Sequence, residues 1–138
     1  MRVNQVDVDI DIGAIVEEVK KATKAGLRAV AEDVASRARA TSAFSDKSGA
    51  LRRSIRVEDP DPDVPLLLVK AGGYTATDNY APHAHLIEYG HAQVTKDGRL
   101  VGHTPARPFM GPARDAAMQQ AGEVAAAAIG PINIRVGR

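Results

Sequence analysis

Apolar side chains recur every three or four residues between residues 14 and 40, which is the spacing of one face of an α-helix. Acidic residues gather near the start of this segment and basic residues near its end, as the helix dipole favours. Gly26 interrupts the pattern and predicts a bend or a close crossing with another helix. The apolar stripe consists of Ile12, Val16, Val19, Thr23, Leu27, Val30, Val34 and Ala38.

Three shorter segments alternate between apolar and polar residues, which is the period of a β-strand. Residues 54–58 and 64–71 predict two strands, and the prolines and aspartates of residues 59–63 predict the turn between them. Residues 83–88 predict a third strand. The polar stretch before the first strand leads into residues 49–54, which predict a helical turn or a strand lead-in.

A hairpin and a second long helix follow. The pair Asp97-Gly98 is a preferred hairpin turn, and it predicts antiparallel pairing of residues 91–95 with residues 99–103. Residues 112–129 are rich in alanine and predict a helix, which Gly130 and the proline after it would end.

Both ends of the chain alternate like strands. Residues 3–12 place valines and isoleucines against aspartates, and residues 132–136 repeat the pattern with basic and amide side chains. Each end is either a short terminal β segment or an arm that pairs with the sheet edge of a neighbouring subunit. We therefore divide a single domain, residues 1–138, into an arm (1–12), a helix–sheet–helix core (13–129) and a second arm (130–138).

These elements predict an α+β fold: a long N-terminal helix, an antiparallel sheet of three to five strands with a hairpin, and a C-terminal helix packed on the sheet. A chain of 138 residues fits one domain by length. Only 4% of the residues are aromatic, so the core must be built mainly from valine, leucine, isoleucine and alanine.

Composition excludes several classes of protein. The formal net charge is +1, from 18 basic and 17 acidic residues, which does not describe a dedicated nucleic-acid binder. There are no cysteines, so disulfides and cysteine-based metal sites are excluded. No apolar run approaches the ~20 residues of a membrane span, and the N-terminus lacks the apolar stretch of a signal peptide. We expect a soluble protein that is intracellular when made and has no membrane partner.

A proline-rich segment predicts a structural clamp. Pro105 and Pro108 hold the backbone extended, and Pro112 suits the first turn of a helix, where its missing N–H costs nothing. Phe109 is the one large side chain between them, and we predict that it is buried where the second helix meets the sheet.

Two motifs together resemble a known family. Glu88-Tyr89-Gly90 is followed, after a loop, by Pro105-Ala106-Arg107-Pro108-Phe109 and then Pro112-Ala113. Upstream, residues 47–55 (KSGALRRSI) carry the pattern Gly-x-Leu-Arg-x-Ser-Ile. This combination is similar to the gene-product-ten family of tailed phages of the Hong Kong 97 type, and the likeness extends from about residue 12 to about residue 128.

The resemblance implies a virion protein of the neck or tail, acting in tail completion or head–tail joining, and present in the host cytoplasm during assembly. It implies a ring, of six copies by analogy with the symmetry of tails, in contact with neck or head-completion proteins and with tail-terminator or tail-tube proteins. The chain departs from the family pattern at His91 and in the hairpin before the proline motif, which bears on the partner contacts. The residues expected to have structural or interface roles are Leu51, Ile55, Glu88, Tyr89, Gly90, Arg107, Pro108, Phe109 and Pro112.

We expect no enzyme, no cofactor and no metal. Glu88 lacks a paired acid or base, since it and His85 would lie on opposite faces of a strand, and its expected role is an ion pair with Arg107 or Arg114 or a hydrogen bond to loop backbone. The main alternative is a small zinc-dependent hydrolase, because histidines on one strand face and across a hairpin could bind zinc. Those histidines are His83, His85, His91 and His103.

Basic residues near the predicted sheet allow a further interpretation. Arg52, Arg53, Arg56 and Lys70 could contact DNA non-specifically if they faced a channel. With a net charge near zero, a solvated surface linked by ion pairs is the simpler interpretation. A toxin–antitoxin or nucleic-acid-binding module is a third alternative, which salt-dependent DNA binding would reveal.

Overall fold

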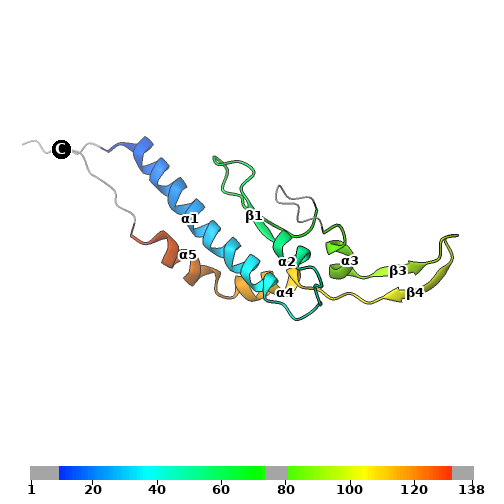
Figure 1. The fold of residues 1–138 in the computed structure, drawn as a ribbon. Coiled ribbons are helices and arrows are strands. Elements are labelled where there is room, and N and C mark those ends of the chain that lie inside the picture. The colour runs from blue at the N-terminus through cyan, green and yellow to red at the C-terminus, as the bar shows by residue number, and fades with distance from the viewer. Residues whose placement is uncertain (1–9, 74–80, 132–138) are drawn as a thin grey trace, which may run out of the picture.

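The computed structural model describes residues 10–73 and 81–131. In it a long helix lies beside two shorter C-terminal helices, and a β-hairpin extends from one end of the molecule (Figure 1). The elements are α1 (Ile12–Arg39), α2 (Ala50–Ser54), β1 (Arg56–Glu58), β2 (Leu68–Lys70), α3 (Ala84–Tyr89), β3 (His91–Val94), β4 (Leu100–Thr104), α4 (Met110–Met118) and α5 (Ala121–Ile129).

The long helix predicted for residues 14–40 is confirmed as α1. It begins at Ile12, because the side chain of Asp11 accepts a hydrogen bond from the backbone N–H of Ala14, at 3.0 Å, and caps the helix. The predicted strand of residues 3–12 is therefore wrong at Ile12, which is helical, and residues 1–9 of that arm lie outside the described residues. The predicted C-terminal strand, residues 132–136, also lies outside them.

The α+β class is confirmed, but the described strands form two separate two-stranded sheets rather than one sheet of three to five strands. β1 pairs antiparallel with β2, with Val57 opposite Val69. β3 pairs antiparallel with β4, as the Asp97-Gly98 turn predicted. β1 and β2 are each three residues long, shorter than predicted, and the proline-rich segment between them forms a loop.

The third predicted strand, residues 83–88, is wrong: this segment is helix α3. The carbonyl of His83 accepts hydrogen bonds from the N–H groups of Leu86 and Ile87, at 3.0 and 3.2 Å. Ala84 and Ile87, three residues apart, both pack on the core, which is a helical spacing. Six residues are too few to separate a period of 2 from a period of 3.6.

The predicted C-terminal helix is two helices, α4 and α5, which break at Gln119 and Gln120. Both pack against α1 rather than mainly against a sheet. A Cβ added to Gly26 would lie 3.0 Å from the side chain of Ile129, so Gly26 marks the close crossing of α1 with α5. Gly130, at φ 61°, ends α5 as predicted.

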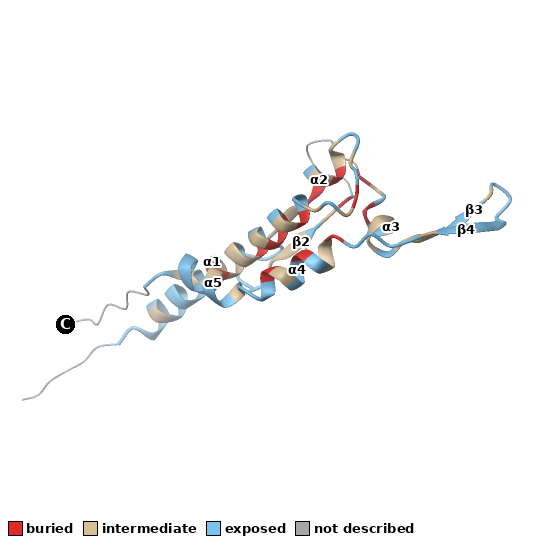
Figure 2. Cartoon of the chain, turned by 90° about the horizontal axis from the view of Figure 1, so that it is seen from below, coloured by how far each residue is buried: buried red, intermediate tan, exposed pale blue. Residues whose placement is uncertain are grey.

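The core lies where α2, α3 and α4 meet the C-terminal half of α1 (Figure 2). Alanines such as Ala35, Ala38 and Ala117 are fully buried there and allow the helices to approach closely. Phe109 is buried, as predicted, and its ring meets that of Phe44 edge to face with centroids 5.0 Å apart. This aromatic pair, with Leu51 and Ile55, supplies the large side chains in a core that is rich in alanine.

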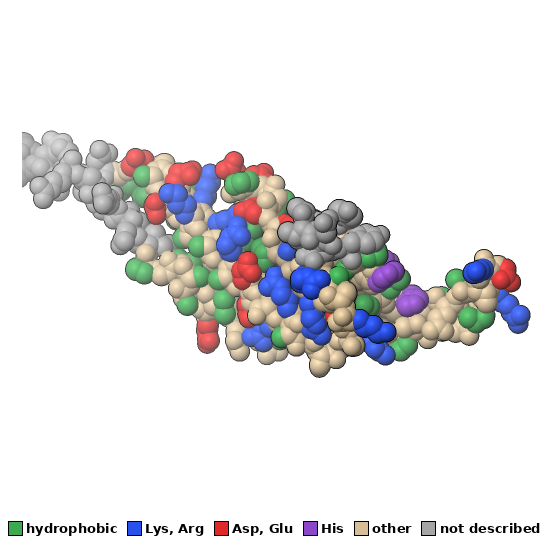
Figure 3. All heavy atoms as spheres, viewed as in Figure 1, with side chains coloured by type: hydrophobic (Ala, Val, Ile, Leu, Met, Phe, Trp, Pro, Cys, Tyr) green, Lys and Arg blue, Asp and Glu red, His purple; other side chains and the backbone are tan. Residues whose placement is uncertain are grey.

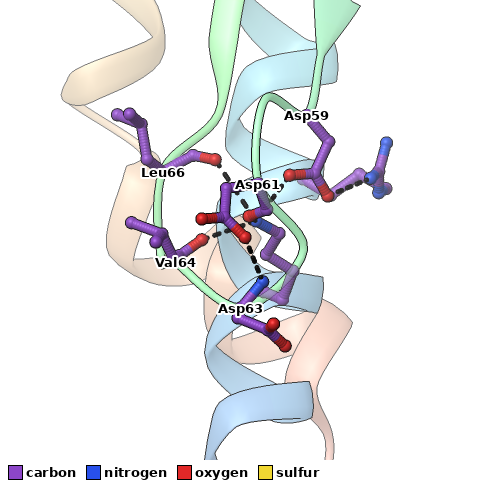
Figure 4. A network of polar contacts seen from close by, with 7 residues as sticks. Asp59, Asp61, Asp63, Val64 and Leu66 are labelled. Carbon is purple, nitrogen blue, oxygen red and sulfur yellow. Dashed lines mark hydrogen bonds and ion pairs between the residues drawn. The ribbon is translucent and has the colours of Figure 1, made fainter.

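Polar contacts from two basic residues of α1 hold the loop between β1 and β2 (Figure 4). Nζ of Lys24 lies 2.7 Å from a carboxylate oxygen of Asp59 and donates to the carbonyls of Asp61 and Val64, at 2.9 and 2.6 Å. Arg28 also contacts the Asp59 carboxylate, at 3.4 Å. The loop therefore has a defined position beside the N-terminal half of α1.

The first testable prediction concerns the aromatic pair. Phe109→Ala removes the ring that packs against Phe44 and should lower the free energy of unfolding by about 3–5 kcal/mol. Tyr89→Ala is the matched control, because Tyr89 is 78% exposed and its loss should change stability by no more than about 0.5 kcal/mol. Denaturant titrations of the two variants would measure both values, and equal effects would contradict this description of the core.

Candidate functional site

The carboxylate of Glu88, near the end of α3, binds the start of α4. One oxygen accepts hydrogen bonds from the backbone N–H groups of Phe109 and Met110, at 2.7 and 3.0 Å, and the other accepts from Gly111, at 3.0 Å. These N–H groups have no partner within the helix, and the positive end of the helix dipole favours an anion here. Of the two roles expected for Glu88, the structure shows the hydrogen bonds to backbone.

The pKa of Glu88 reflects this position. Partial burial raises the pKa, but the three backbone N–H groups lower it and the positive charge of Arg114 adds to their effect. The net result is a pKa below the ordinary value of 4.5, so the carboxylate is charged at neutral pH. A charged group satisfied by backbone donors is suited to a structural role.

Two further contacts fix the chain on either side of the hairpin. The N–H of Arg107 donates to the carbonyl of Ile87 at 2.7 Å, which ties the segment after β4 to α3. Gly90, at φ 72°, precedes β3, and a Cβ there would lie 2.6 Å from the carbonyl oxygen of Thr104. We call Ile87, Glu88, Gly90, Arg107 and the first turn of α4 the hairpin clamp.

The hairpin itself, β3 and β4 with their turn, extends away from the body (Figures 1 and 2). Its large apolar side chains Val94, Leu100 and Val101 are each at least 60% exposed. An isolated two-stranded hairpin is marginally stable in water, and apolar side chains on it gain nothing from solvent. The hairpin clamp therefore holds a projecting hairpin with exposed apolar side chains in one direction.

The upstream motif, residues 47–55, forms the other side of the core. Asp46 accepts hydrogen bonds from the N–H groups of Gly49 and Arg52, both at 2.9 Å, and so caps α2. Ser54 is fully buried, where its hydroxyl donates to the carbonyl of Leu51 and accepts from the N–H of Gly72. Leu51 and Ile55 are buried in the core beside them.

Most of the basic residues near β1 serve the fold. The guanidinium of Arg52 donates to the carbonyls of Thr41 and Phe44, at 2.8 and 3.1 Å, and lies 4.7 Å from the centre of the Phe44 ring. Arg56 and Lys70 both form ion pairs with Glu58, at 2.8 and 2.6 Å. These contacts, from Lys70 first and Arg56 next, lower the pKa of Glu58. Arg52, Arg56 and Lys70 of the predicted basic group are therefore engaged by backbone carbonyls or by the Glu58 carboxylate.

The four histidines lie in or beside α3 and the hairpin. In the part of the chain that the structure describes, no three histidine, aspartate or glutamate side chains are grouped so that they could hold a metal ion. His85 and Glu88 lie three residues apart on a helix, so the expectation that they lie on opposite faces of a strand is wrong. The zinc-hydrolase alternative lacks the ligand cluster that it requires among these residues.

The remaining expected site residues are at the surface. Tyr89 is 78% exposed at the end of α3, next to the clamp, and Pro108 and Pro112 are exposed on either side of Phe109. Sequence reasoning missed Phe44, Asp46 and the burial of Ser54. Asp46 stands three residues before Gly49, and an aspartate ahead of a short helical segment could have been recognised as a cap.

None of the helices within residues 10–73 and 81–131 combines the length and apolar character that a membrane span requires. Residues 10–90 match the family model described as "Bacteriophage HK97-gp10, putative tail-component". No curated protein and no solved structure matches the chain. The matched residues include α1, α2, the first sheet and α3, with Glu88 and Gly90 at their end.

The second prediction concerns Glu88. Because folding lowers its pKa, its charge stabilises the fold above pH 4.5, and this contribution is lost as the pH falls below 4.5 through the folded-state pKa. Glu88→Gln should therefore lower stability by about 1–2 kcal/mol at neutral pH, with a difference from wild type that shrinks in acid.

Glu32→Gln, on an exposed position of α1, is the matched control and should leave stability nearly unchanged. Urea titrations of the three proteins across the acid range would measure the differences. A Glu88→Gln effect that is absent at neutral pH, or that does not vary with pH, would contradict the role of the charged carboxylate.

Proposed function

Because the chain belongs to the HK97-gp10 family of bacteriophage tail components, and so is a structural tail protein of the virion, we propose that it acts at the head–tail junction as a tail-completion subunit. Six copies form a ring, by analogy with tail symmetry. One face of the ring contacts neck or head-completion proteins, and the other contacts the tail-terminator or tail-tube protein.

The projecting hairpin is the observation that carries this proposal. Its apolar side chains are exposed and its strands have no further sheet partner among the described residues, yet the clamp holds both of its ends to the core. A protein that worked alone would gain nothing from such an element, whereas a subunit of an assembly gains a contact of defined direction.

The distribution of buried residues also supports a subunit role. Burial is concentrated around α2, α4 and the C-terminal half of α1, while Ile12, Val16 and Val19 on the N-terminal half are exposed (Figure 2). These three side chains follow a helical spacing and so lie on one face of α1, and an exposed apolar patch of this kind is typical of an interaction site. Contacts with neighbouring copies would cover them.

A phage that lacks this gene tests the proposed position. Complete heads and complete tails of normal length should accumulate separately, and adding the purified protein should join them into infectious particles. Electron microscopy of the lysate, before and after addition, would show the result. Missing tails, tails of altered length, or normally joined particles would each contradict a role in completing the junction.

The third prediction concerns the N-terminal arm. Deleting residues 1–9 leaves Asp11, which caps α1, so the domain should fold with an unchanged melting temperature. We expect the truncated protein to fail in joining heads to tails, because the arm would pair with a neighbouring subunit. Infectious particles at normal yield from the truncated protein would show that the arm has no part in assembly.

A further inference from the structure

We propose that the hairpin tip of one copy docks into a groove between α1 and the loop of residues 59–66 on the next copy. This inference rests on the proposed ring and names the contact that would build it. It concerns two surfaces of the same chain whose chemistry is complementary.

The groove has a volume of about 240 Å³. Val19 and Thr23 of α1 form one wall, and Pro62, Val64 and Pro65 of the loop form the other. The contacts of Lys24 with Asp59 and with the loop carbonyls keep the walls in place (Figure 4). Val19 and Val64 are 45% and 42% exposed, so the groove offers apolar surface that is open to a partner.

The loop that forms one wall of the groove carries negative charge. Asp61 and Asp63 are exposed on the loop, and the side chain of Asp61 accepts a hydrogen bond from the N–H of Asp63. Lys24 and Arg28 form their ion pairs with Asp59. Lys20, which also lines the groove, contacts Glu17 at 3.4 Å. Asp61 and Asp63 are therefore the acidic groups left to meet a partner.

The hairpin tip carries the opposite pattern. Val94 pairs with Leu100 across the two strands, which places both side chains on one face of the hairpin. Lys96 and Arg99 flank the turn with one acidic residue, Asp97, between them, and Figure 3 shows these charges at the tip beside hydrophobic side chains. An apolar face with a net positive tip matches an apolar groove whose loop wall carries exposed aspartates.

The arrangement of the two surfaces selects a second copy as the occupant. The hairpin extends away from the body on the side far from the loop of residues 59–66, so the chain cannot fill its own groove (Figure 1). A contact between two different surfaces of the same chain is head-to-tail, and it repeats from copy to copy and gives a ring when the rotation between copies closes.

Paired charge reversals test the contact. Lys96→Glu with Arg99→Glu makes a hairpin variant, and Asp61→Lys with Asp63→Lys makes a loop variant. Each alone should weaken self-association by about tenfold or more at low salt, since like charges would meet at every contact. An equimolar mixture should associate as the wild type does, because each variant's hairpin then meets the other's complementary groove.

Sedimentation velocity measures the association, and thermal melts check folding. Should the loop variant melt early because Asp61 also holds the loop, Asp63→Lys alone replaces it. Unimpaired association of either variant, or a mixture that does not recover, would overturn the proposed contact. If the variants contradict the contact but electron micrographs of the same samples still show rings, the ring proposal stands and only the docking of the hairpin is wrong.

Cross-linking tests the contact in the particle itself. The chain has no cysteines, so Leu100→Cys with Val64→Cys in one chain should give a ladder of disulfide-linked oligomers in assembled virions. Each single variant, and the control pair Met118→Cys with Val64→Cys, should give no ladder. Infectious particles of the double variant without a ladder would overturn the docking of the hairpin while leaving a role at the junction intact.

Discussion

The carboxylate of Glu88 is the group on which the arrangement of this protein depends. It joins α3 to α4 by accepting hydrogen bonds from three successive backbone N–H groups of residues 109–111. Charge-assisted bonds of this kind are short and directional, and the N-terminus of a helix is where the backbone supplies them. The first turn of α4 is therefore fixed against α3 at one angle.

Two consequences follow from that fixed angle. Phe109 enters the core against Phe44, and the strands of the hairpin leave the body from points held by Gly90 and by the bond between Arg107 and Ile87. The Glu-aromatic-Gly motif and the proline motif, 15 residues apart in sequence at Gly90 and Pro105, therefore form one device. Its structural result is a rigid base for an exposed hairpin.

The alanine-rich core explains why the fold depends on hydrogen-bonded contacts such as those of Glu88. Most of its buried side chains are alanines, each of which buries little apolar area. Because burial stabilises the fold by ~25 cal/mol per Å² of apolar surface, each alanine contributes little to the free energy of unfolding. The polar contacts of Arg52, Ser54 and Lys24 with backbone carbonyls and amides supplement this small core. Stability is thus spread over hydrogen-bonded junctions, while apolar side chains such as Ile12 on α1 and Leu100 on the hairpin are exposed.

Local pattern predicted the elements whose signal is long or chemically specific. The helix α1, the Asp97-Gly98 turn and the burial of Phe109 were predicted from the sequence, and Gly26 was predicted to mark either a bend or the close crossing that the structure shows. The predicted apolar stripe of α1 is buried only at Val34 and Ala38, since Ile12, Val16 and Val19 are exposed. α3 was misassigned because a six-residue segment shows no clear period. The break between α4 and α5 was missed, since an alanine-rich segment carries a helical pattern through it.

Features that depend on distant residues could not be derived from local pattern. The sequence left Glu88 between an ion pair and a hydrogen bond to backbone, because the choice depends on where α4 begins in space. Phe44 lies 65 residues before its partner Phe109, and the sequence near either residue does not predict their contact. The separation of the strands into two sheets is likewise a result of packing rather than of local preference.

If the Glu88 carboxylate holds the hairpin in one direction, the distance from the hairpin tip to α1 should be narrowly distributed. The chain has no cysteines, so a variant with both Asp97→Cys and Glu32→Cys carries one spin label on the hairpin tip and one on α1. Both positions are exposed. Double electron–electron resonance would then give the distribution of distances between the labels. A narrow distribution in the otherwise wild-type chain that broadens clearly with Glu88→Gln is the expected result. Equal widths in the two proteins would contradict the claim.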